Sequence, residues 1–185
     1  MPVHFINNLM SEFKETQRFK FILLPIILLH AGIGLLLAND LYKQLYLGQI
    51  DAKKPMSDEG LILTAVFLNV LMLLVEWLFS KAKLEIRIDN LGLYYKYFPF
   101  IRAWKSLDHR DIESFEVGKY NALMDYGGWG YRRGGKKMGL CLNVWGNQGL
   151  KLQLTNGKKL LLGTQEPAKL AVAMNQMMNK TTYGA

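Results

Sequence analysis

The segment from Tyr126 to Lys137, with the sequence YGGWGYRRGGKK, combines residue types that can bind an anion. Its glycines permit positive φ and a close approach of the backbone, and successive amides in such a segment can form an anion-binding nest. Its aromatic residues favour a membrane interface, and its cations can contact an anionic headgroup. The predicted anion, lipid or partner-binding loop consists of Tyr126, Gly127, Gly128, Trp129, Gly130, Tyr131, Arg132, Arg133, Lys136 and Lys137.

A structural role for this segment is the alternative that the residues leave open. Trp129 would then close one end of a β-barrel, and Arg132 would pair with a carboxylate. Arg133, Lys136 and Lys137 would form a solvated charged surface.

Catalytic and metal-binding patterns are not recognisable elsewhere in the sequence. Walker, GxGxxG, HExxH and GxSxG motifs are absent. Cys141 is the only cysteine and lies in an apolar alternating stretch, which is typical of a small buried hydrophobe. The Asp108–Asp111 stretch groups two carboxylates with a histidine, but we expect an exposed turn there. The sequence therefore predicts a protein that is not an enzyme and that holds no cofactor or metal.

Two apolar stretches, Phe21–Ala38 and Leu61–Phe79, predict transmembrane helices. The first has no charged residue, and the second has only Glu76, near its end. Because about 20 helical residues span a hydrocarbon core of about 30 Å, we expect helices over about 19–40 and 60–81. A signal peptide and a buried helix of a soluble protein are the alternatives. The first stretch is longer than the usual signal-peptide core of about 7–15 residues, and two such stretches are unusual in a soluble chain of 185 residues.

Three polar side chains interrupt these apolar stretches: His30, Asn69 and Glu76. Polar residues inside a membrane are functional candidates by default. The favoured interpretation is that they hydrogen-bond between the two helices or within an oligomer. The alternative is that they contact the helices of a partner.

Charges on either side of the apolar stretches predict the topology. Six cations flank them on the side of the chain termini: Lys14, Arg18, Lys20, Lys81, Lys83 and Arg87. The connecting segment is richer in acids, with Asp40, Asp51, Asp58 and Glu59 against Lys43, Lys53 and Lys54. The positive-inside rule then places both termini in the cytoplasm. The net charge of +8 arises from the C-terminal part, since the chain from Lys81 onward has 17 Lys/Arg and eight Asp/Glu.

Alternation of apolar and polar residues after Ser80 predicts a β domain. We expect seven short strands, at about 84–88, 93–98, 103–107, 112–117, 139–144, 150–155 and 158–162. Asn156-Gly157 predicts a type I′ hairpin turn. A helix opens at Pro167, and Leu170, Met174 and Met177/Met178 follow at helical spacing. A strongly bent antiparallel sheet or barrel, with the helix over one open end, is a compact solution, and it is the pleckstrin-homology-like (PH-like) architecture.

Two motifs carry a resemblance to a family. Asp125–Arg132 contains GGWGYR, and Leu154–Pro167 contains NGKKLLLGTQEP, followed by Leu170. Residues 84–178 thereby resemble bacterial membrane-anchored proteins with a PH-like domain, many of unassigned function. The resemblance implies the fold but no inositol-lipid site, since the first hairpin loop, Asp89-Asn90, is short and acidic where phosphoinositide-binding PH domains carry basic residues.

The expected organisation is thus an α+β membrane protein in four parts. A cytoplasmic segment (1–20) precedes the transmembrane hairpin (21–81), the PH-like domain (82–179) and a frayed tail (180–185). We expect a non-enzymatic interaction module, integral to the bacterial inner (cytoplasmic) membrane, that binds a protein partner, a second copy of itself or anionic lipid. The alternative is an accessory or regulatory subunit that meets a transporter or membrane enzyme through its helices. Nucleic acid is not an expected partner, because acids interleave with the cations and the chain is membrane-anchored.

Overall fold

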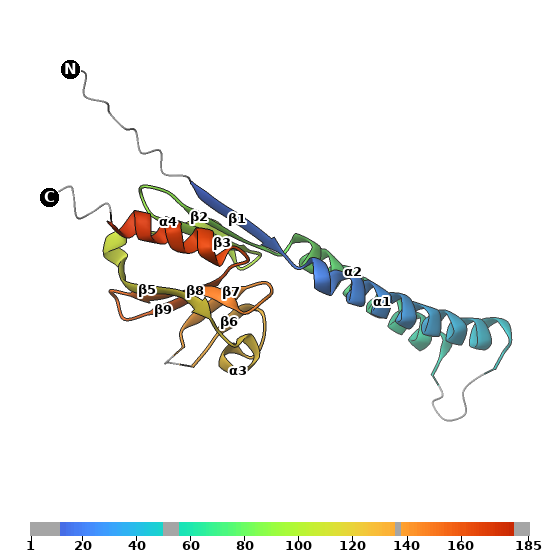
Figure 1. Ribbon diagram of the computed structural model, residues 1–185. Helices are drawn as coiled ribbons and strands as arrows, with labels where there is room; N and C mark the ends of the chain where they lie inside the picture. Colours follow the sequence, from blue (N-terminus) through green and yellow to red (C-terminus); the bar gives the residue numbers. More distant parts are fainter. Residues whose placement is uncertain (1–11, 50–55, 136–137, 180–185) are drawn as a thin grey trace, which may run out of the picture. The chain divides into compact units, whose positions relative to one another are not determined.

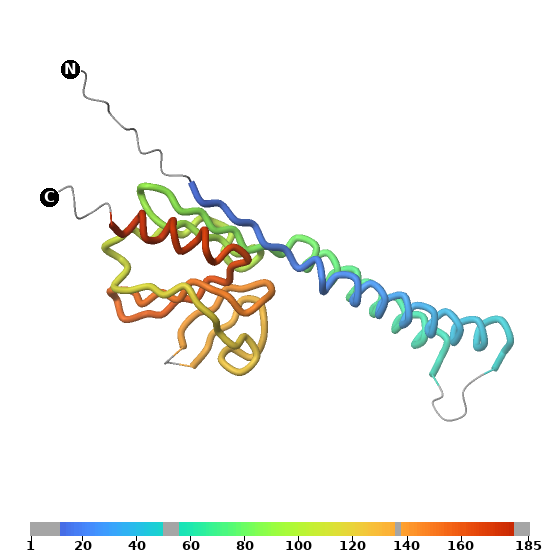
Figure 2. The backbone as a smooth tube through the Cα atoms, in the orientation of Figure 1, coloured from blue at the N-terminus to red at the C-terminus, as the bar shows by residue number. Residues whose placement is uncertain are grey.

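The computed structural model describes residues 12–49, 56–135 and 138–179, which form two compact units (Figure 1). Residues 12–18 join residues 82–135 and 138–179 in a β domain, and residues 19–49 and 56–81 form a helical hairpin. The N-terminal segment is therefore divided between the two units, and its first described residues belong to the β domain. The backbone trace runs from a strand into a helix after Arg18 and from a helix into a strand after Lys81, with one residue between the elements each time (Figure 2).

The helical unit consists of α1 (Lys20–Leu41), a π-helical turn (Tyr42–Tyr46) and α2 (Asp58–Lys81). Both predicted helices are present, and both are long and apolar enough to cross a membrane. The helices pack along a seam of residues spaced three or four apart, the spacing of a coiled coil. The less exposed residues at this spacing are Leu23, Ile26, His30, Ile33 and Leu37 of α1, and Leu61, Ala65, Leu68, Asn69, Met72, Val75, Glu76 and Phe79 of α2.

The outward faces of both helices are apolar and exposed. Leu24, Leu28 and Leu35 on α1 are examples, as are Phe67 and Leu74 on α2. A core helix of a soluble domain would bury such side chains under other elements. The described structure does not cover them, so a lipid environment accounts for these faces better than a soluble core does.

The first sheet of the β domain is antiparallel, with the strand order β1-β2-β3-β4. Its strands are β1 (Phe13–Arg18), β2 (Lys83–Ile88), β3 (Leu93–Phe98) and β4 (Ile101–Leu107). Strand β1 was not predicted. Its buried side chains are Phe13, Glu15 and Gln17, so two of the three inward positions are polar and the usual apolar alternation is missing.

The second sheet is mixed, with the strand order β5-β8-β9-β7-β6. Its strands are β5 (Ile112–Lys119), β6 (Gly130–Arg133), β7 (Leu140–Asn143), β8 (Gln148–Leu154) and β9 (Lys159–Gly163). The expectation of a wholly antiparallel sheet was wrong, because β7 runs parallel to β9. Strands β7 and β8 follow each other along the chain but lie on opposite sides of β9, so residues 144–147 cross the end of β9.

The hairpin between β8 and β9 forms at the predicted Asn156-Gly157 position, but its turn is not of type I′. Only Gly157 has positive φ, at 77°, whereas type I′ requires it at both central residues. The amide of Leu154 donates to the carbonyl of Lys158, so the chain reverses over three residues instead of two.

Helix α4 (Pro167–Asn179) closes the β domain as predicted. It contacts β1 and β2 of the first sheet and β5 and β8 of the second, and so lies across the opening between the sheets (Figure 1). Leu170, Ala173, Met174 and Met177 form its buried face. Each fully buried large apolar side chain of this kind stabilises the fold by roughly 1.5–3 kcal/mol.

Candidate functional site

The predicted binding loop is not a single loop. Tyr126 is the last residue of a short helix, α3 (Ala122–Tyr126), and Gly130–Arg133 form strand β6. Asn121 caps α3 by accepting a hydrogen bond from the amide of Met124, at 3.1 Å. Lys136 and Lys137 lie outside the described residues. The segment was taken for a loop because its glycines conceal a four-residue edge strand.

The backbone amides of the glycine segment are engaged inside the β domain. Gly127 donates to the carbonyl of Leu123 at 2.9 Å, and Gly128 donates to that of Ala122 at 2.8 Å. Gly130 donates to the side-chain oxygen of Asn143 at 2.7 Å. Gly127 ends α3 in the left-handed conformation, with φ of 71°. These three amides are therefore not available for an anion nest.

Trp129 anchors the segment to the outer face of the second sheet. Its indole N–H donates to the carbonyl of Gly146 at 3.0 Å, and its ring stacks on Trp145 with 5.2 Å between centroids. It also packs on a small core of Tyr120, Ala122, Cys141 and Leu161, which Tyr126 joins. Trp129 is thus structural, but it covers a sheet face and does not close a barrel end.

Asn143 is the hub that joins the glycine segment to both sheets. It is fully buried, and its side-chain amide donates to the hydroxyl of Tyr120 at 2.9 Å. Its carbonyl accepts from the hydroxyl of Tyr97 on β3, at 3.1 Å. Burial raises the pKa of Tyr120 to about 12 and also raises the pKa of Tyr97, so both phenols stay protonated.

The second motif, Gly163-Thr164-Gln165, is also structural. The Thr164 hydroxyl donates to one oxygen of the buried Glu15 carboxylate at 2.6 Å, and the Gln165 amide donates to the other at 2.7 Å. The Gln165 side chain donates to the carbonyl of Trp145 at 2.8 Å. Burial raises the pKa of Glu15, although these hydrogen bonds partly offset the effect. The two motifs therefore meet at residues 143–146, where the chain crosses the end of β9.

Arg132 and Arg133, the two cations of the segment that the structure describes, remain exposed. The Arg132 guanidinium donates through Nε to the carbonyl of Trp129 at 3.1 Å, and not to a carboxylate as the structural alternative expected. Arg133 is exposed on β6. No ion pair forms at either residue within the described residues. Both side chains can therefore meet an anionic ligand.

An exposed aromatic and cationic turn beside Tyr131 was missed by the sequence analysis. Phe100, between β3 and β4, packs on Tyr131 with 5.0 Å between ring centroids, yet it is 65% exposed. Arg102 follows it, with its guanidinium carbon 5.9 Å from the centroid of the Phe98 ring. The signal that could have found this turn is the run of aromatic residues around Pro99 followed by an arginine.

The three polar residues of the helices form one cluster, as the favoured interpretation predicted. His30 Nδ1 lies 2.8 Å from Glu76 Oε1, and His30 Nε2 lies 3.2 Å from Asn69 Oδ1. The Asn69 amide donates to the carbonyl of Ala65 at 2.8 Å, which turns Oδ1 toward His30. With this orientation of the Asn69 amide, Nε2 is the donor to Oδ1. The cluster is satisfied within the hairpin.

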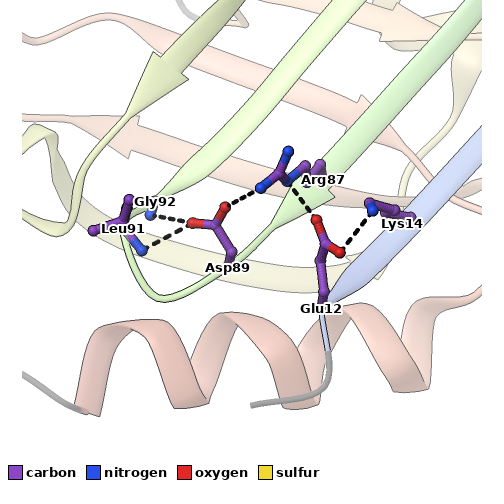
Figure 3. A network of polar contacts seen from close by, with 6 residues as sticks. All are labelled: Glu12, Lys14, Arg87, Asp89, Leu91 and Gly92. Carbon is purple, nitrogen blue, oxygen red and sulfur yellow. Dashed lines mark hydrogen bonds and ion pairs between the residues drawn. The ribbon is translucent and has the colours of Figure 1, made fainter. Parts of the chain in front are cut away.

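The first hairpin loop uses its acidic residue internally (Figure 3). The Asp89 carboxylate accepts from the amides of Leu91 and Gly92 at 2.9 and 3.2 Å, and it pairs with Arg87 at 2.8 Å. Glu12 pairs with Arg87 on its other side, at 2.6 Å. These contacts hold the loop at the end of the first sheet and leave it without a basic pocket.

The remaining chemical candidates have structural roles. Asp108 and Asp111 form a reciprocal capping box around a 3-10 turn (His109–Asp111), as expected of an exposed turn. Burial raises the pKa of the Cys141 thiol to about 12, which suits a buried hydrophobe and not a nucleophile. Among the described residues, no cluster of acids, histidines and cysteine could hold a metal ion.

A groove of about 370 Å³ lies on the outer face of the second sheet, beside Tyr126. Lys119, Lys151 and Glu116 are among its lining residues, and Lys151 pairs with Glu116 at 3.0 Å. Mixed, partly paired charges of this kind do not specify a ligand.

No model of a known protein family matches the chain, and a search of curated proteins finds no match either.

Proposed function

We propose that this chain is a non-enzymatic, membrane-anchored PH-like module at the cytoplasmic face of a bacterial inner membrane. Its β domain binds an extended, acidic segment of a partner protein, which adds a strand to β4. The observation that carries this proposal is the open edge of the first sheet at β4.

Strand β4 is unusual because both of its faces are solvent-exposed. Every side chain from Arg102 to Ser106 is exposed, and β4 pairs with β3 alone within the described residues. An edge strand of this kind offers free backbone groups to an added strand. Trp104 supplies an apolar contact, and the ammonium of Lys96 lies 4.6 Å from its ring centroid.

The positive charge of the β4 edge favours a partner segment of negative charge. Arg102 and Lys105 are the charged residues of β4, so the strand is wholly cationic. An acidic extended segment would complement this charge, whereas a basic one would be repelled.

Membrane anchoring is supported by the two helices and by the way that they connect to the β domain. One residue, Phe19, separates β1 from α1, and one residue, Ala82, separates α2 from β2. If the helices cross a bilayer, these links hold the β domain at its surface. The excess of cations beside both links favours the cytoplasmic side.

The alternative of a subunit that meets a partner through its helices is less well supported. His30, Asn69 and Glu76 were the residues expected to contact such a partner, and they bond to one another inside the hairpin.

A site-specific photo-cross-linker at Ser106 of the full-length protein, in its native membrane, tests partner binding on β4. We expect one defined adduct with another protein, and mass spectrometry should place the cross-link in an acidic segment. Trp104→Ala combined with Lys105→Glu should abolish the adduct. Lys158→Glu, in the exposed turn between β8 and β9, is the matched control and should preserve it. An adduct that survives the β4 changes, or one between two copies of this chain, would refute the proposal.

A further inference from the structure

We propose that the end of the β domain from which the chain enters the helices is a lipid-docking face. Phe100 and Trp145 enter the membrane interface there, and Arg102 and Arg132 contact the phosphates of anionic headgroups. This inference rests on the membrane anchoring proposed above, and the docking face shares only Arg102, near the start of β4, with the partner-binding edge.

The strand register places Phe100 at this end. Arg18 of β1 pairs with Lys83 of β2, and Lys83 pairs with Phe98 of β3. Neighbouring strands lie about 4.8 Å apart, so Phe98 is about 10 Å from Arg18 across the sheet. The turn that contains Phe100 follows directly. Because a residue spans at most about 3.6 Å, the one-residue links keep this end of the sheet next to any bilayer that the helices cross.

The second sheet ends at the same place. The side chain of Gln17, one residue before the end of β1, donates to the carbonyl of Gly163 at 2.7 Å. Gly163 is the last residue of β9, and the chain crosses the end of this strand at Trp145. The side chain of Gln165 holds the Trp145 carbonyl in place. Trp145 therefore belongs to the same end of the domain as Phe100.

The two aromatic side chains are fixed but remain exposed. Phe100 packs one part of its ring on Tyr131 and Tyr97, with centroids 5.0 and 6.2 Å away, and is still 65% exposed. Trp145 stacks on Trp129 and is 45% exposed. Aromatic residues of this kind are enriched at membrane–water interfaces. Their packing means that little conformational entropy is lost when they enter the interface.

The cations at this end are not neutralised. Arg102 donates through Nε to the carbonyl of Pro99 at 3.4 Å, and Arg132 donates to that of Trp129. Neither forms an ion pair with a carboxylate within the described residues. Each cation near an anionic leaflet favours the docked state by about 5.4-fold, so the two together favour it by about 30-fold.

The opposite end of the first sheet provides an internal comparison. Leu91, in the turn between β2 and β3, is 77% exposed, but the charges around it are paired in the network of Arg87, Asp89 and Glu12 (Figure 3). Within the part of the chain that the structure describes, the cations of this network, Lys14 and Arg87, are both paired with carboxylates, and this end lies at the far end of strand β3 from Phe100.

The test places an environment-sensitive fluorophore at Phe100→Cys or, as the matched control, at Leu91→Cys. The full-length protein is reconstituted in nanodiscs of phosphatidylcholine, with or without about one-third phosphatidylglycerol. Cys141 is fully buried and is not expected to react. We expect a blue shift and quenching by shallow nitroxide lipids at position 100 in anionic nanodiscs, and neither effect at position 91. Arg102→Gln with Arg132→Gln should lower the docked-to-undocked ratio about 30-fold, and Lys158→Gln should not change it.

Three outcomes would overturn the inference. Equal quenching at positions 100 and 91 would show that the docking face has no preference for lipid. Quenching at position 100 that persists without anionic lipid, or in the double arginine variant, would show that contacts with anionic headgroups do not drive docking. Failure of the chain to co-elute with nanodiscs would refute the membrane anchoring itself, which is distinguishable from both of the other results.

Discussion

Glu15 shows how a single buried carboxylate organises the β domain. It lies on the strand that enters the first helix, and it accepts hydrogen bonds from Thr164 and Gln165 at the end of β9. A buried carboxylate with two donors is costly to ionise but also costly to remove, because the donors would lose their acceptor. The conformation of the Gly163-Thr164-Gln165 motif therefore depends on a residue almost 150 positions away.

The stability of the protein should depend on pH through Glu15. Burial raises its pKa above the ordinary value of 4.5. Because its pKa is higher in the folded than in the unfolded protein, Glu15 contributes its full stabilisation below its unfolded-state pKa. This contribution is lost as the pH rises through its folded-state pKa. Glu15→Gln keeps the hydrogen-bonding shape without the charge. We therefore expect its thermal midpoint, relative to wild type, to increase as the pH rises from about 4.5 to 8.

Circular dichroism in detergent micelles measures this difference, with Glu113→Gln as the exposed control. The midpoints of the control should follow those of wild type at every pH. Parallel curves for Glu15→Gln and wild type would show that Glu15 does not titrate as a buried acid. Glu15→Ala should destabilise at all pH values, since each unsatisfied donor costs about 1–3 kcal/mol.

Asn143→Leu should be among the most destabilising single changes in the β domain. The amide of Gly130 and the hydroxyl of Tyr120 would both lose their partner inside the fold. At about 1–3 kcal/mol for each group, we expect the thermal midpoint to fall by about 10 °C or more. Asn147→Ala is the control, because Asn147 is exposed and its side chain makes no hydrogen bond in the described structure. A midpoint within 2–3 °C of wild type would contradict the assignment of Asn143 as the hub.

At the scale of elements, strands with apolar alternation were predictable and strands held by polar contacts were not. Strands β2 and β8 show the expected alternation, and α4 has the expected helical spacing. Strand β3 was located by its aromatic residues, and β9 by the Asn156-Gly157 turn before it. Strand β1 escaped prediction because Glu15 and Gln17 occupy inward positions, and their partners at Gly163 and Thr164 are known only from the tertiary structure. Likewise, β6 was concealed by flanking glycines.

The candidate site was predictable in composition but not in role. Trp129 and the glycines were singled out for their chemistry, and the structure engages them within the domain. The parallel pairing of β7 with β9 was not predictable either, because the sequence does not encode which side of β9 the preceding strand occupies. In the helices, the contact among the polar residues was predictable from the sequence, because lipid offers such side chains no hydrogen-bond partner.

The helical hairpin should depend on the pairing of His30 with Glu76. His30→Leu would leave Glu76 in the seam without its partner, which is more costly than removing both groups. We expect each single change to Leu to destabilise the hairpin and the double change to restore much of the loss, with a coupling of about 0.5–2 kcal/mol. The free energies of unfolding of wild type, both single variants and the double variant, measured in mixed micelles, complete this double-mutant cycle. Additive losses would show that the observed contact does not contribute to stability.

At the scale of the whole molecule, the strand pairing restricts the topology. Strands β1 and β2 are neighbours, and each continues into one of the helices after a single residue. The β domain is thus built from chain segments on both sides of the hairpin. If one helix failed to cross the bilayer, β1 and β2 would be separated by the membrane and the first sheet could not form. The first sheet can therefore form only if both helices cross the bilayer or neither does.

Cysteine accessibility tests this requirement with two variants. Gln49→Cys lies between the helices, Lys158→Cys lies in the β domain, and the native Cys141 is buried. A membrane-impermeant maleimide added to cells with a permeabilised outer membrane should label Gln49→Cys at once. It should label Lys158→Cys only after the inner membrane is broken, because the proposed topology, which the cation excess beside both links favours, has the β domain in the cytoplasm. The reverse order would preserve two crossings but place the β domain outside. Equal labelling of both variants in intact cells would contradict the two-crossing topology. It would also contradict the interpretation that the bilayer covers the apolar faces of α1 and α2.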